Sequence, residues 1–423
     1  MQEKIINHFI SLTKVPHCSQ NCKEFFNFLT NFAKRHGYEV QSDEVKNILI
    51  KKGDPKLALQ AHYDMVCMGK APQIETFVKD GWMFAKDSSL GADNGIAIAM
   101  MMQLMEQGED LEFILTADEE VGLIGAGAID LELNAQYMLN VDFEDEGIVC
   151  IGCAGGADLI AQKRVEKAEA YTYSYEVSVL GLDGGHSGVE IHKNIPNAIK
   201  VLADYLKDKE VRIASCQGGE RRNSIPSNIV MKLSSKEPLE SNHWVSVKKI
   251  EETLVVYESR NFLDLLNEFK HGIHEFNDEF NLADSSINLA IVSFEDAHIK
   301  IECSSRAMDS KGLETINGTT LKLFKKYEFE SSIDHKYPAW KPEINAFTSS
   351  VNDAMIKVFG SSKYEAIHAG LECGVLLERY PNMKFASIGP IIVSPHSTHE
   401  KVKLDSVGKI FEVVEELVET FKP

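Results

Sequence analysis

The chain of 423 residues is long enough for two or three domains, and its 44% hydrophobic and 26% charged residues are typical of a globular protein. Its formal net charge of -20 repels a phosphate backbone and an anionic lipid surface, so nucleic-acid binding and membrane docking are both disfavoured. The first fifteen residues lack the apolar core of a signal peptide, and no apolar run reaches membrane-spanning length.

The cysteine pattern indicates a reducing compartment. Eight cysteines are scattered along the chain without the spacing of a disulfide framework, so reduced thiols are expected. Two close groupings, at residues 17–22 and 150–153, have no second half elsewhere, and we interpret both as structural. The expected location is therefore cytoplasmic.

The N-terminal third alternates helix-like and strand-like segments. Apolar residues recur at helical spacing in two stretches, 22–37 and 94–108. Short apolar runs that are typical of strands occupy residues 56–62, 110–117 and 137–142. This alternation predicts an α/β layer with a largely parallel sheet.

After residue 169 the pattern changes to strands with one solvated face. Such strands are predicted at 171–182, 227–233, 286–294 and 298–305, with a polar helix at 261–276. After two prolines, helix and strand alternate again up to a C-terminal amphipathic helix. The simplest architecture is an α/β catalytic domain, residues 1–169 and 341–423, whose mostly parallel sheet is flanked by helices and which is interrupted by an inserted α+β domain, residues 170–340.

Polar residues stand at the ends of the predicted strands and at a helix start. They are His62, Asp64, Asp93, Glu119, Glu120 and Asp142. The carboxyl ends of strands in an open α/β sheet gather at one edge, so these side chains can converge. Carboxylates at contact distance take up protons unless a cation neutralises them. The pattern therefore predicts one or two divalent cations.

The residue types narrow the chemistry further. Histidine with carboxylate suits Zn²⁺, Mn²⁺ or Co²⁺, and zinc is the first choice. Adjacent acids such as Glu119 and Glu120 suit two tasks, one as a ligand and one as a base. Each acid alone also has an ordinary interpretation, since Asp93 can cap a helix, the glutamates can lie in a solvated loop and Asp142 can end a strand. The absence of HExxH, GxSxG and phosphate-loop motifs leaves metal-dependent hydrolysis as the enzyme class.

Nine blocks that span nearly the whole chain resemble, in order, the zinc aminoacylase, carboxypeptidase and dipeptidase superfamily. They are "HYDMV", "LGADNGIA", "ADEEVGLIGA", "NVDFEDEG", "GCAGGAD", "GGHSGVEIHKNIPNA", "RRNSIPSN", "IHAGLECG" and "GPIIVSPHSTHEKVKLDSVG". The resemblance is strongest to the Xaa-His dipeptidase (aminoacyl-histidine dipeptidase) branch. It implies a metallodipeptidase with two divalent metal ions as cofactors.

The resemblance also implies the ligands of each metal. For one metal they are His62, Asp93 and Asp142. For the other they are Asp93, Glu120 and His396, with Asp93 bridging the two. The family's last histidine lies four residues before a glutamate, which here is Glu400, so His396 is the expected ligand, although spacing alone leaves His399 open as the alternative.

Three further expectations concern the general base, the peptide bond after Asp93 and the support of His62. The resemblance makes Glu119 the general base and makes the peptide bond Asp93–Asn94 cis. Side chains two apart in a strand face the same way, so the carboxylate of Asp64 is expected beside His62, where it would orient the ligand ring.

The inserted domain resembles the lid of the family, which is also its dimerisation domain. There the resemblance assigns oxyanion stabilisation to His186. It assigns the substrate backbone and terminal carboxylate to Asn223 and Arg306, and arginine suits a carboxylate because its planar fork donates two hydrogen bonds. His368 and Glu372 are substrate-side candidates. Whether His186 serves its own subunit or a partner's, and whether the protein is a homodimer, are left open.

The expected function is hydrolysis of dipeptides, of the Xaa-His type or more broadly, by water that two metals activate. An N-acyl amino acid deacylase is the nearest enzymatic alternative, because it needs the same metals and the same carboxylate contact. A non-catalytic metal-binding scaffold is the alternative from another class, and the presence of every expected ligand and of the base disfavours it.

Overall fold

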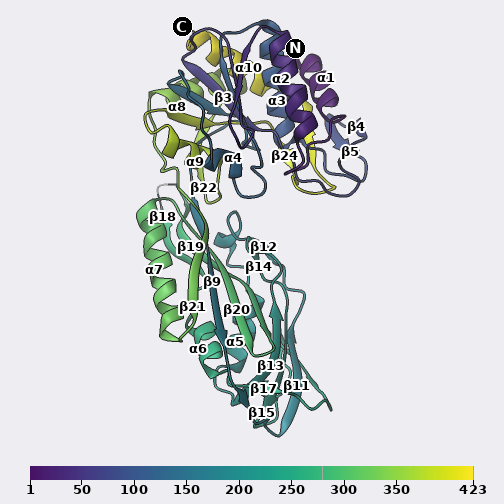
Figure 1. Ribbon diagram of the computed structural model, residues 1–423, viewed down its shortest axis with the longest axis vertical. Helices are drawn as coiled ribbons and strands as arrows, with labels where there is room; N and C mark the ends of the chain where they lie inside the picture. The colour runs from purple at the N-terminus through teal and green to yellow at the C-terminus, as the bar shows by residue number, and fades with distance from the viewer. Residues whose placement is uncertain (279, 423) are drawn as a thin grey trace. The chain divides into compact units, whose positions relative to one another are not determined.

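The computed structural model describes residues 1–278 and 280–422, and it divides into two compact units (Figure 1). The first unit comprises Met1–Cys153, Trp340–Ala366 and Leu371–Pro423, and the second comprises Ala154–Ala339 and Ile367–Gly370. The second unit thus begins at residue 154, earlier than the predicted 170, because the strand that follows Cys153 pairs with strands of the second unit. The short return at 367–370 was not predicted.

The first unit is built on a sheet with strand order β1-β2-β6-β3-β7-β23-β8-β22. Neighbouring strands are parallel from β6 through β3 and β7 to β23, whereas β1 pairs antiparallel with β2, β2 with β6, and β8 with β23. The strands are β1 (Glu39–Ser42), β2 (Ile48–Lys51), β3 (Leu57–His62), β6 (Glu112–Thr116), β7 (Tyr137–Asn140), β8 (Ile148–Cys153), β22 (Lys363–Ile367) and β23 (Lys384–Ser387). The predicted α/β class is confirmed.

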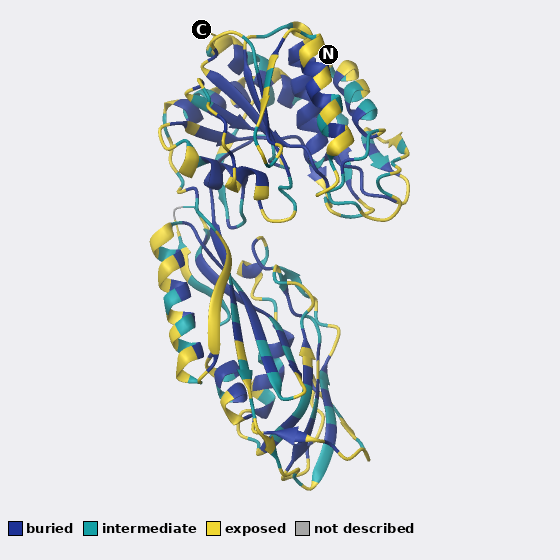
Figure 2. Ribbon diagram, viewed as in Figure 1, coloured by how far each residue is buried: buried dark blue, intermediate teal, exposed yellow. Residues whose placement is uncertain are grey.

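Helices enclose the sheet of the first unit, and every residue of β3, β6 and β8 is buried (Figure 2). Strands covered on both faces need continuous apolar runs, which explains why these segments lack alternation. The helices are α1 (Gln2–Leu12), α2 (Lys23–Arg35), α3 (Ala92–Gln107), α4 (Ile124–Gly127), α8 (Ala346–Phe359), α9 (Glu372–Arg379) and α10 (Leu404–Thr420). No helix in the described part of the chain is long and apolar enough to cross a membrane.

A small antiparallel sheet and a disulfide complete the first unit. The sheet has the order β24-β25-β5-β4. Its strands are β4 (Thr76–Lys79), β5 (Trp82–Ala85), β24 (Ile392–Val393) and β25 (Lys401–Lys403). The disulfide joins Cys18 to Cys67, which corrects the expectation of reduced thiols at these two positions. Its partners are 49 residues apart and meet because Cys18 forms an isolated β-bridge with Met65, a contact that spacing could not reveal.

The second unit is a long antiparallel sheet with helices packed on it. Its strand order is β16-β11-β15-β13-β19-β20-β9-β21, joined by β10, β17 and β18. The strands are β9 (Gly155–Arg164), β10 (Lys167–Ala168), β11 (Tyr173–Val179), β13 (Val211–Gly218), β15 (Ile229–Ser235), β16 (Ser246–Lys249), β17 (Val256–Tyr257), β18 (Gly272–Asn277), β19 (Leu282–Glu295), β20 (His298–Ala307) and β21 (Glu330–Tyr337). A separate ribbon pairs β12 (Gly185–His186) with β14 (Ser224–Ile225). The half-solvated pattern of the predicted strands reflects this sheet.

The helices of the second unit are α5 (Ala198–Leu206), α6 (Arg260–Glu268) and α7 (Ser310–Lys326), with a short 3-10 turn at Ile191–Lys193. They cover an apolar core that the sheet shares. The helix predicted at 261–276 is wrong in its second half, because α6 ends at Glu268 and Gly272 begins β18. Gly272 has φ of +101°, a left-handed conformation that a helix cannot continue through.

Candidate metal centre and active site

The candidate ligands of the first unit stand at the carboxyl ends of its central strands. His62 is the last residue of β3, Glu119 and Glu120 follow β6, and Asp142 lies two residues beyond β7. Asp93 comes from the first turn of α3. Because β3, β6 and β7 run parallel, these ends meet at one edge of the sheet. The structure thus brings together the residues that the sequence singled out.

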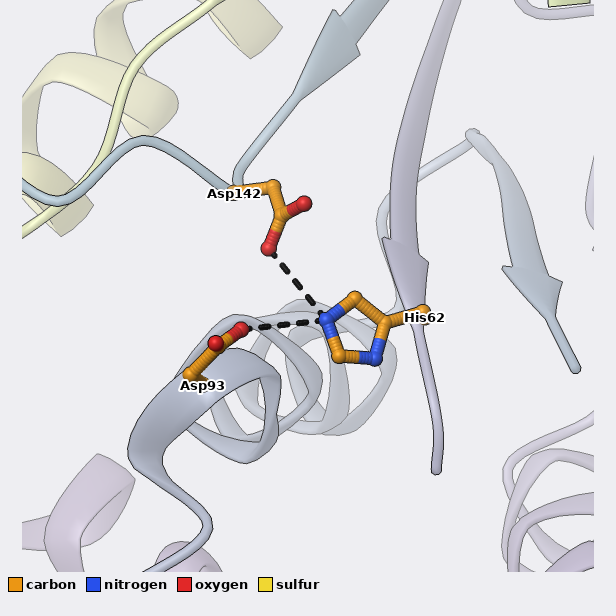
Figure 3. Close-up of side chains that lie close together, drawn as sticks. All are labelled: His62, Asp93 and Asp142. Carbon is orange, nitrogen blue, oxygen red and sulfur yellow. Dashed lines mark hydrogen bonds and ion pairs between the residues drawn. The ribbon is translucent and has the colours of Figure 1, made fainter. Parts of the chain in front are cut away.

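Two sets of side chains form at this edge, and Asp93 belongs to both. His62 Nε2 lies 3.0 Å from Asp93 Oδ1 and 3.5 Å from Asp142 Oδ1 (Figure 3). His396 Nε2 lies 3.0 Å from Asp93 Oδ2 and 2.8 Å from Glu120 Oε2. Ligand atoms within each set lie within 4.8 Å of one another. One oxygen of Asp93 faces each set, which is the arrangement that a bridging ligand needs.

The charges in these two sets fit divalent cations. Burial raises the pKa of Glu120 and of Asp142, and it raises the pKa of Glu119 well above its usual range. Among the described residues, Glu120 Oε1 is buried and has no hydrogen-bond partner. A buried carboxylate oxygen without a donor fits a metal ion as its missing partner. Imidazole together with carboxylate in each set suits Zn²⁺, Mn²⁺ or Co²⁺.

Asp64 supports the site through its carboxylate, which lies beside His62 as expected, and also through its carbonyl group. His62 Nδ1 donates a hydrogen bond to the carbonyl oxygen of Asp64 over 3.0 Å, whereas the carboxylate oxygen Oδ1 lies 3.6 Å from Nδ1. The Asp64 carboxylate also accepts hydrogen bonds from the backbone N–H groups of Glu119, over 3.0 Å, and Glu120, over 3.4 Å. The carbonyl therefore orients the ring, and the carboxylate holds the loop that carries the adjacent acids.

A buried carboxylate fixes the turn that presents Asp93. Glu400 accepts hydrogen bonds from the backbone N–H groups of Leu90 (2.7 Å), Gly91 (3.0 Å), Ala92 (2.7 Å) and Asp93 (3.2 Å). Burial raises the pKa of Glu400 to about 7. The sequence marked Glu400 only by its spacing within the "HSTHE" block, and its role depends on a contact 307 residues away in the chain.

The start of α3 is also tied to the end of β7. The peptide bond Asp93–Asn94 is cis, as the resemblance implied, and both residues have non-helical backbone angles. Asn94 Nδ2 donates hydrogen bonds to the carbonyl oxygen of Val141, over 2.9 Å, and to the carboxylate of Asp142. This contact sets two of the candidate ligands, Asp93 and Asp142, in fixed relation to each other.

A layer of polar side chains lies one step below the candidate ligands in the same strands. Glu372 Oε2 accepts hydrogen bonds from Gln60 Nε2 over 2.5 Å and from Thr116 Oγ1 over 2.7 Å. Asn140 Nδ2 donates to Gln60 Oε1 over 2.6 Å, and Ser387 Oγ donates to Asn140 Oδ1. The layer thus links β6, β3, β7 and β23. For Gln60 and Asn140 the signal in the sequence is their position two residues before His62 and Asp142, because strand side chains repeat their direction every second residue.

The position of Glu372 corrects the expectation that it lies on the substrate side. It is 0% exposed at the start of α9, where it supports two strands from within the unit. Burial raises its pKa to about 7. A carboxyl group that is fully enclosed by its own unit is out of reach of a substrate.

His186 and Asn223 come together in the second unit. His186 ends β12, which pairs with β14, and Asn223 directly precedes β14. His186 Nδ1 accepts hydrogen bonds from the backbone N–H groups of Gly188 and Val189, each over 3.2 Å. In the neutral ring this places the proton on Nε2 and makes that atom a donor. A donor of this kind is what stabilisation of an oxyanion needs.

Arg306 and His368 form a second cluster in this unit. Arg306 is 8% exposed, and its Nη1 donates a hydrogen bond to Tyr337 Oη over 2.9 Å. His368 Nε2 lies 2.7 Å from the hydroxyl of Ser286, which is opposite Arg306 on β19. Burial, followed by the charge of Arg306, lowers the pKa of His368 to about 3, so the ring is neutral. We call Ser286, Arg306, Tyr337 and His368 the Arg306 cluster.

A sheet edge that gathers two histidines with several acids is the construction of a metal-dependent hydrolase. The family model for Peptidase family M20/M25/M40 matches residues 58–420, and the chain belongs to this family. It is therefore a metallopeptidase, a hydrolase that acts on peptide bonds, and the resemblance seen in the sequence is confirmed.

Individual relatives agree with this assignment. The chain is 30% identical over 464 residues to the cytosol non-specific dipeptidase of Escherichia coli (strain K12), covering 97% of this chain and 96% of the relative. It is similar to the crystal structure of aminoacylhistidine dipeptidase from Vibrio alginolyticus, with a TM-score of 0.84, 27% identity, and coverage of 99% of this chain and 96% of that one. A dinuclear metal-binding M20 peptidase from Bacillus subtilis shares the fold, with a TM-score of 0.52, 10% identity, and coverage of 99% and 98%.

Proposed function

We propose that this metallopeptidase hydrolyses dipeptides, including those of the Xaa-His type, in the cytoplasm. The observation that carries the proposal is the pair of histidine and carboxylate sets that share Asp93. Two similar proteins, named as a cytosol non-specific dipeptidase and an aminoacylhistidine dipeptidase, support dipeptides as the substrate class. The two names differ in how broad a range of dipeptides is cleaved.

The proposed cofactors are two divalent metal ions, zinc in the first place and manganese or cobalt otherwise. The proposed ligands of one ion are His62, Asp93 and Asp142. Those of the other are Asp93, Glu120 and His396, rather than His399. When bound there, the two ions would lower the pKa of the attacking water and would polarise the scissile carbonyl.

Glu119 is the proposed general base, which takes the proton of the attacking water and delivers it to the leaving amine. A carboxylate oxygen of Glu119 lies within 4.8 Å of a carboxylate oxygen of Glu120 and of a ring nitrogen of His62. The backbone N–H group of Glu119 donates a hydrogen bond to Asp64. Burial raises the pKa of Glu119 well above its usual range in the metal-free site, so its carboxyl group is able to hold a proton there.

The second unit is the proposed lid, and its polar side chains are assigned to the substrate. His186 donates to the oxyanion, Asn223 binds the substrate backbone, and Arg306 binds the terminal carboxylate with His368 beside it. A homodimer is proposed as well. Mixing an inactive His186→Ala subunit with an inactive Glu119→Gln subunit tests whether His186 acts across such a dimer, because activity returns only if His186 serves the partner's metal centre.

Glu119→Gln tests the central role of the proposal. The amide keeps the size of the side chain but cannot take a proton, so turnover of alanyl-histidine should fall by about 10²–10⁴-fold. Bound zinc, measured by elemental analysis, should remain at the wild-type amount. Glu412→Gln changes an exposed glutamate of α10 in the same unit and should leave both quantities unchanged. Turnover of Glu119→Gln near the wild-type rate would refute the assignment.

Substrate comparison separates the proposal from its alternatives. A dipeptidase should cleave alanyl-histidine in preference to N-acetyl-histidine, whereas an N-acyl amino acid deacylase should reverse this order. A non-catalytic scaffold should bind zinc and cleave neither compound.

A further inference from the structure

Tyr337 reaches Arg306 across a strand position that has no side chain. Gly156 of β9 pairs with Arg306 of β20 on one side and with Tyr337 of β21 on the other. Neighbouring strands are about 4.8 Å apart, so the Cα atoms of Tyr337 and Arg306 are separated by about 10 Å. The Tyr337 hydroxyl nevertheless accepts a hydrogen bond from Arg306 Nη1 over 2.9 Å. The ring therefore extends over Gly156.

Two glycines make room for this ring. A Cβ atom at Gly156 would lie 2.5 Å from Tyr337 Cζ and Oη, and a Cβ atom at Gly370 would lie 2.9 Å from Tyr337 Cε2. Both distances are shorter than nonbonded atoms tolerate, so any larger residue would displace the ring. These glycines belong to the "GCAGGAD" and "IHAGLECG" blocks, and the close approach of Tyr337 gives them a physical reason.

The guanidinium that Tyr337 contacts has the properties of an anion-binding group. Arg306 is 8% exposed, and its Nε has no hydrogen-bond partner among the described residues. A buried cation with an unpaired donor is costly, and a carboxylate relieves that cost by accepting two parallel hydrogen bonds. Arginine offers this pair of donors in one plane, so the rotation of the plane decides whether a carboxylate can be bound.

We propose that Tyr337 is a positioning residue that fixes the plane of the Arg306 guanidinium, so that Arg306 selects substrates with a free terminal carboxylate. By accepting from Nη1, the Tyr337 hydroxyl leaves the other N–H groups of Arg306 to the carboxylate. The two glycines leave space for the Tyr337 ring, and the Tyr337 hydroxyl fixes the orientation of the Arg306 guanidinium. The guanidinium in turn binds the carboxylate end of the substrate. This inference rests on the proposed role of Arg306 in dipeptide hydrolysis.

Tyr337→Phe tests the inference, because it keeps the ring and removes the hydroxyl. For L-alanyl-L-histidine, KM should rise about tenfold, the effect of losing a hydrogen bond to a charged group, while kcat stays within about twofold. For the C-terminal amide of the same dipeptide, kcat/KM should not change. Gly370→Ala should move KM in the same direction by displacing the ring.

Two matched variants control for nonspecific damage to the second unit. Tyr205→Phe removes a hydroxyl that donates to the carbonyl oxygen of Glu240, and Gly318→Ala adds a methyl group where nothing lies within 4 Å. Both variants should keep the wild-type KM and the wild-type preference for the free acid over the amide.

The outcomes separate the inference from the proposed function. If the wild-type protein prefers the free acid and Tyr337→Phe keeps that preference in full, the positioning role of Tyr337 is overturned while the role of Arg306 stands. If the wild-type protein cleaves acid and amide equally well, the carboxylate role of Arg306 fails, and the inference fails with it. Loss of the preference in Tyr337→Phe, with both control variants unchanged, supports the inference.

Discussion

Replacing Glu400 by alanine removes the acceptor of four backbone N–H groups at the turn that presents Asp93. Leaving one buried donor without a partner costs about 1–3 kcal/mol. Water that enters the space of the lost side chain replaces part of these contacts, so we expect the free energy of unfolding to drop by about 3 kcal/mol. The turn should also hold Asp93 less firmly.

The expected loss of metal binding follows from the contacts of Asp93. One oxygen of Asp93 faces His62 and the other faces His396, so a displaced Asp93 weakens both sets. Removing a group that supports a ligand lowers metal affinity by about 10–100-fold. Glu400→Gln keeps one of the two accepting oxygens and should fall between the wild type and Glu400→Ala.

Two measurements check the Glu400 prediction. Urea denaturation in the presence of a chelator reports the stability of the metal-free protein, and competition with a chromogenic chelator reports zinc affinity. Glu412→Ala, at an exposed position of α10, is the control and should change stability by less than about 0.5 kcal/mol. If Glu400→Ala binds zinc as tightly as the wild type and is no less stable than Glu412→Ala, the reasoning is refuted.

Three further predictions concern other parts of the molecule. Burial raises the pKa of Glu372 from its ordinary value of 4.5 to about 7 in the folded protein, so native Glu372 resists ionisation and wild-type stability falls as the pH rises from about 4.5 to about 7. The variant Glu372→Gln cannot ionise. The difference in free energy of unfolding between this variant and the wild type, measured by urea denaturation, should therefore favour the variant by up to about 3 kcal/mol more at pH 8 than at pH 4. The same difference at both pH values would contradict this prediction. Cys67→Ser opens a disulfide between residues 49 apart, which should lower the free energy of unfolding by about 4 kcal/mol. A reducing agent should lower the free energy of unfolding of the wild type by the same amount as the substitution does. It should leave the free energy of unfolding of Cys67→Ser unchanged. His186→Ala removes the donor proposed for the oxyanion, so kcat should fall about 10²–10³-fold with bound zinc unchanged, and a kcat within about twofold of wild type would exclude the role.

Most of the candidate ligands could be predicted from local sequence signals, whereas His396 came from the family resemblance alone. His62 closes an apolar run, and the pair Glu119–Glu120 follows another. Parallel strands present their carboxyl ends at one edge of the sheet, so polar residues at those ends lie near one another. Local pattern and general sheet geometry were therefore enough to predict that these residues meet.

The contacts that support the ligands could not be predicted, because they join segments that are distant in the chain. Spacing placed Asp64 beside His62 but did not show that its carbonyl would face the ring while its carboxylate held the next loop. The glutamate in the "IHAGLECG" block appeared to belong to the substrate, whereas the fold encloses it beside Gln60, 312 residues away. Burial and partner are properties of the packed chain.

The sequence by itself thus determined the class of the protein, the residue types at its candidate metal centre and the existence of an inserted domain. These features are encoded by residues that lie close together in the sequence, so they can be recognised without knowledge of the fold. Only the tertiary structure decided that the inserted unit begins at residue 154, that Cys18 bonds to Cys67, and that Tyr337 crosses Gly156 to reach Arg306. Each of these depends on which strand or loop lies next to which, and that choice is made by the burial of whole elements against one another.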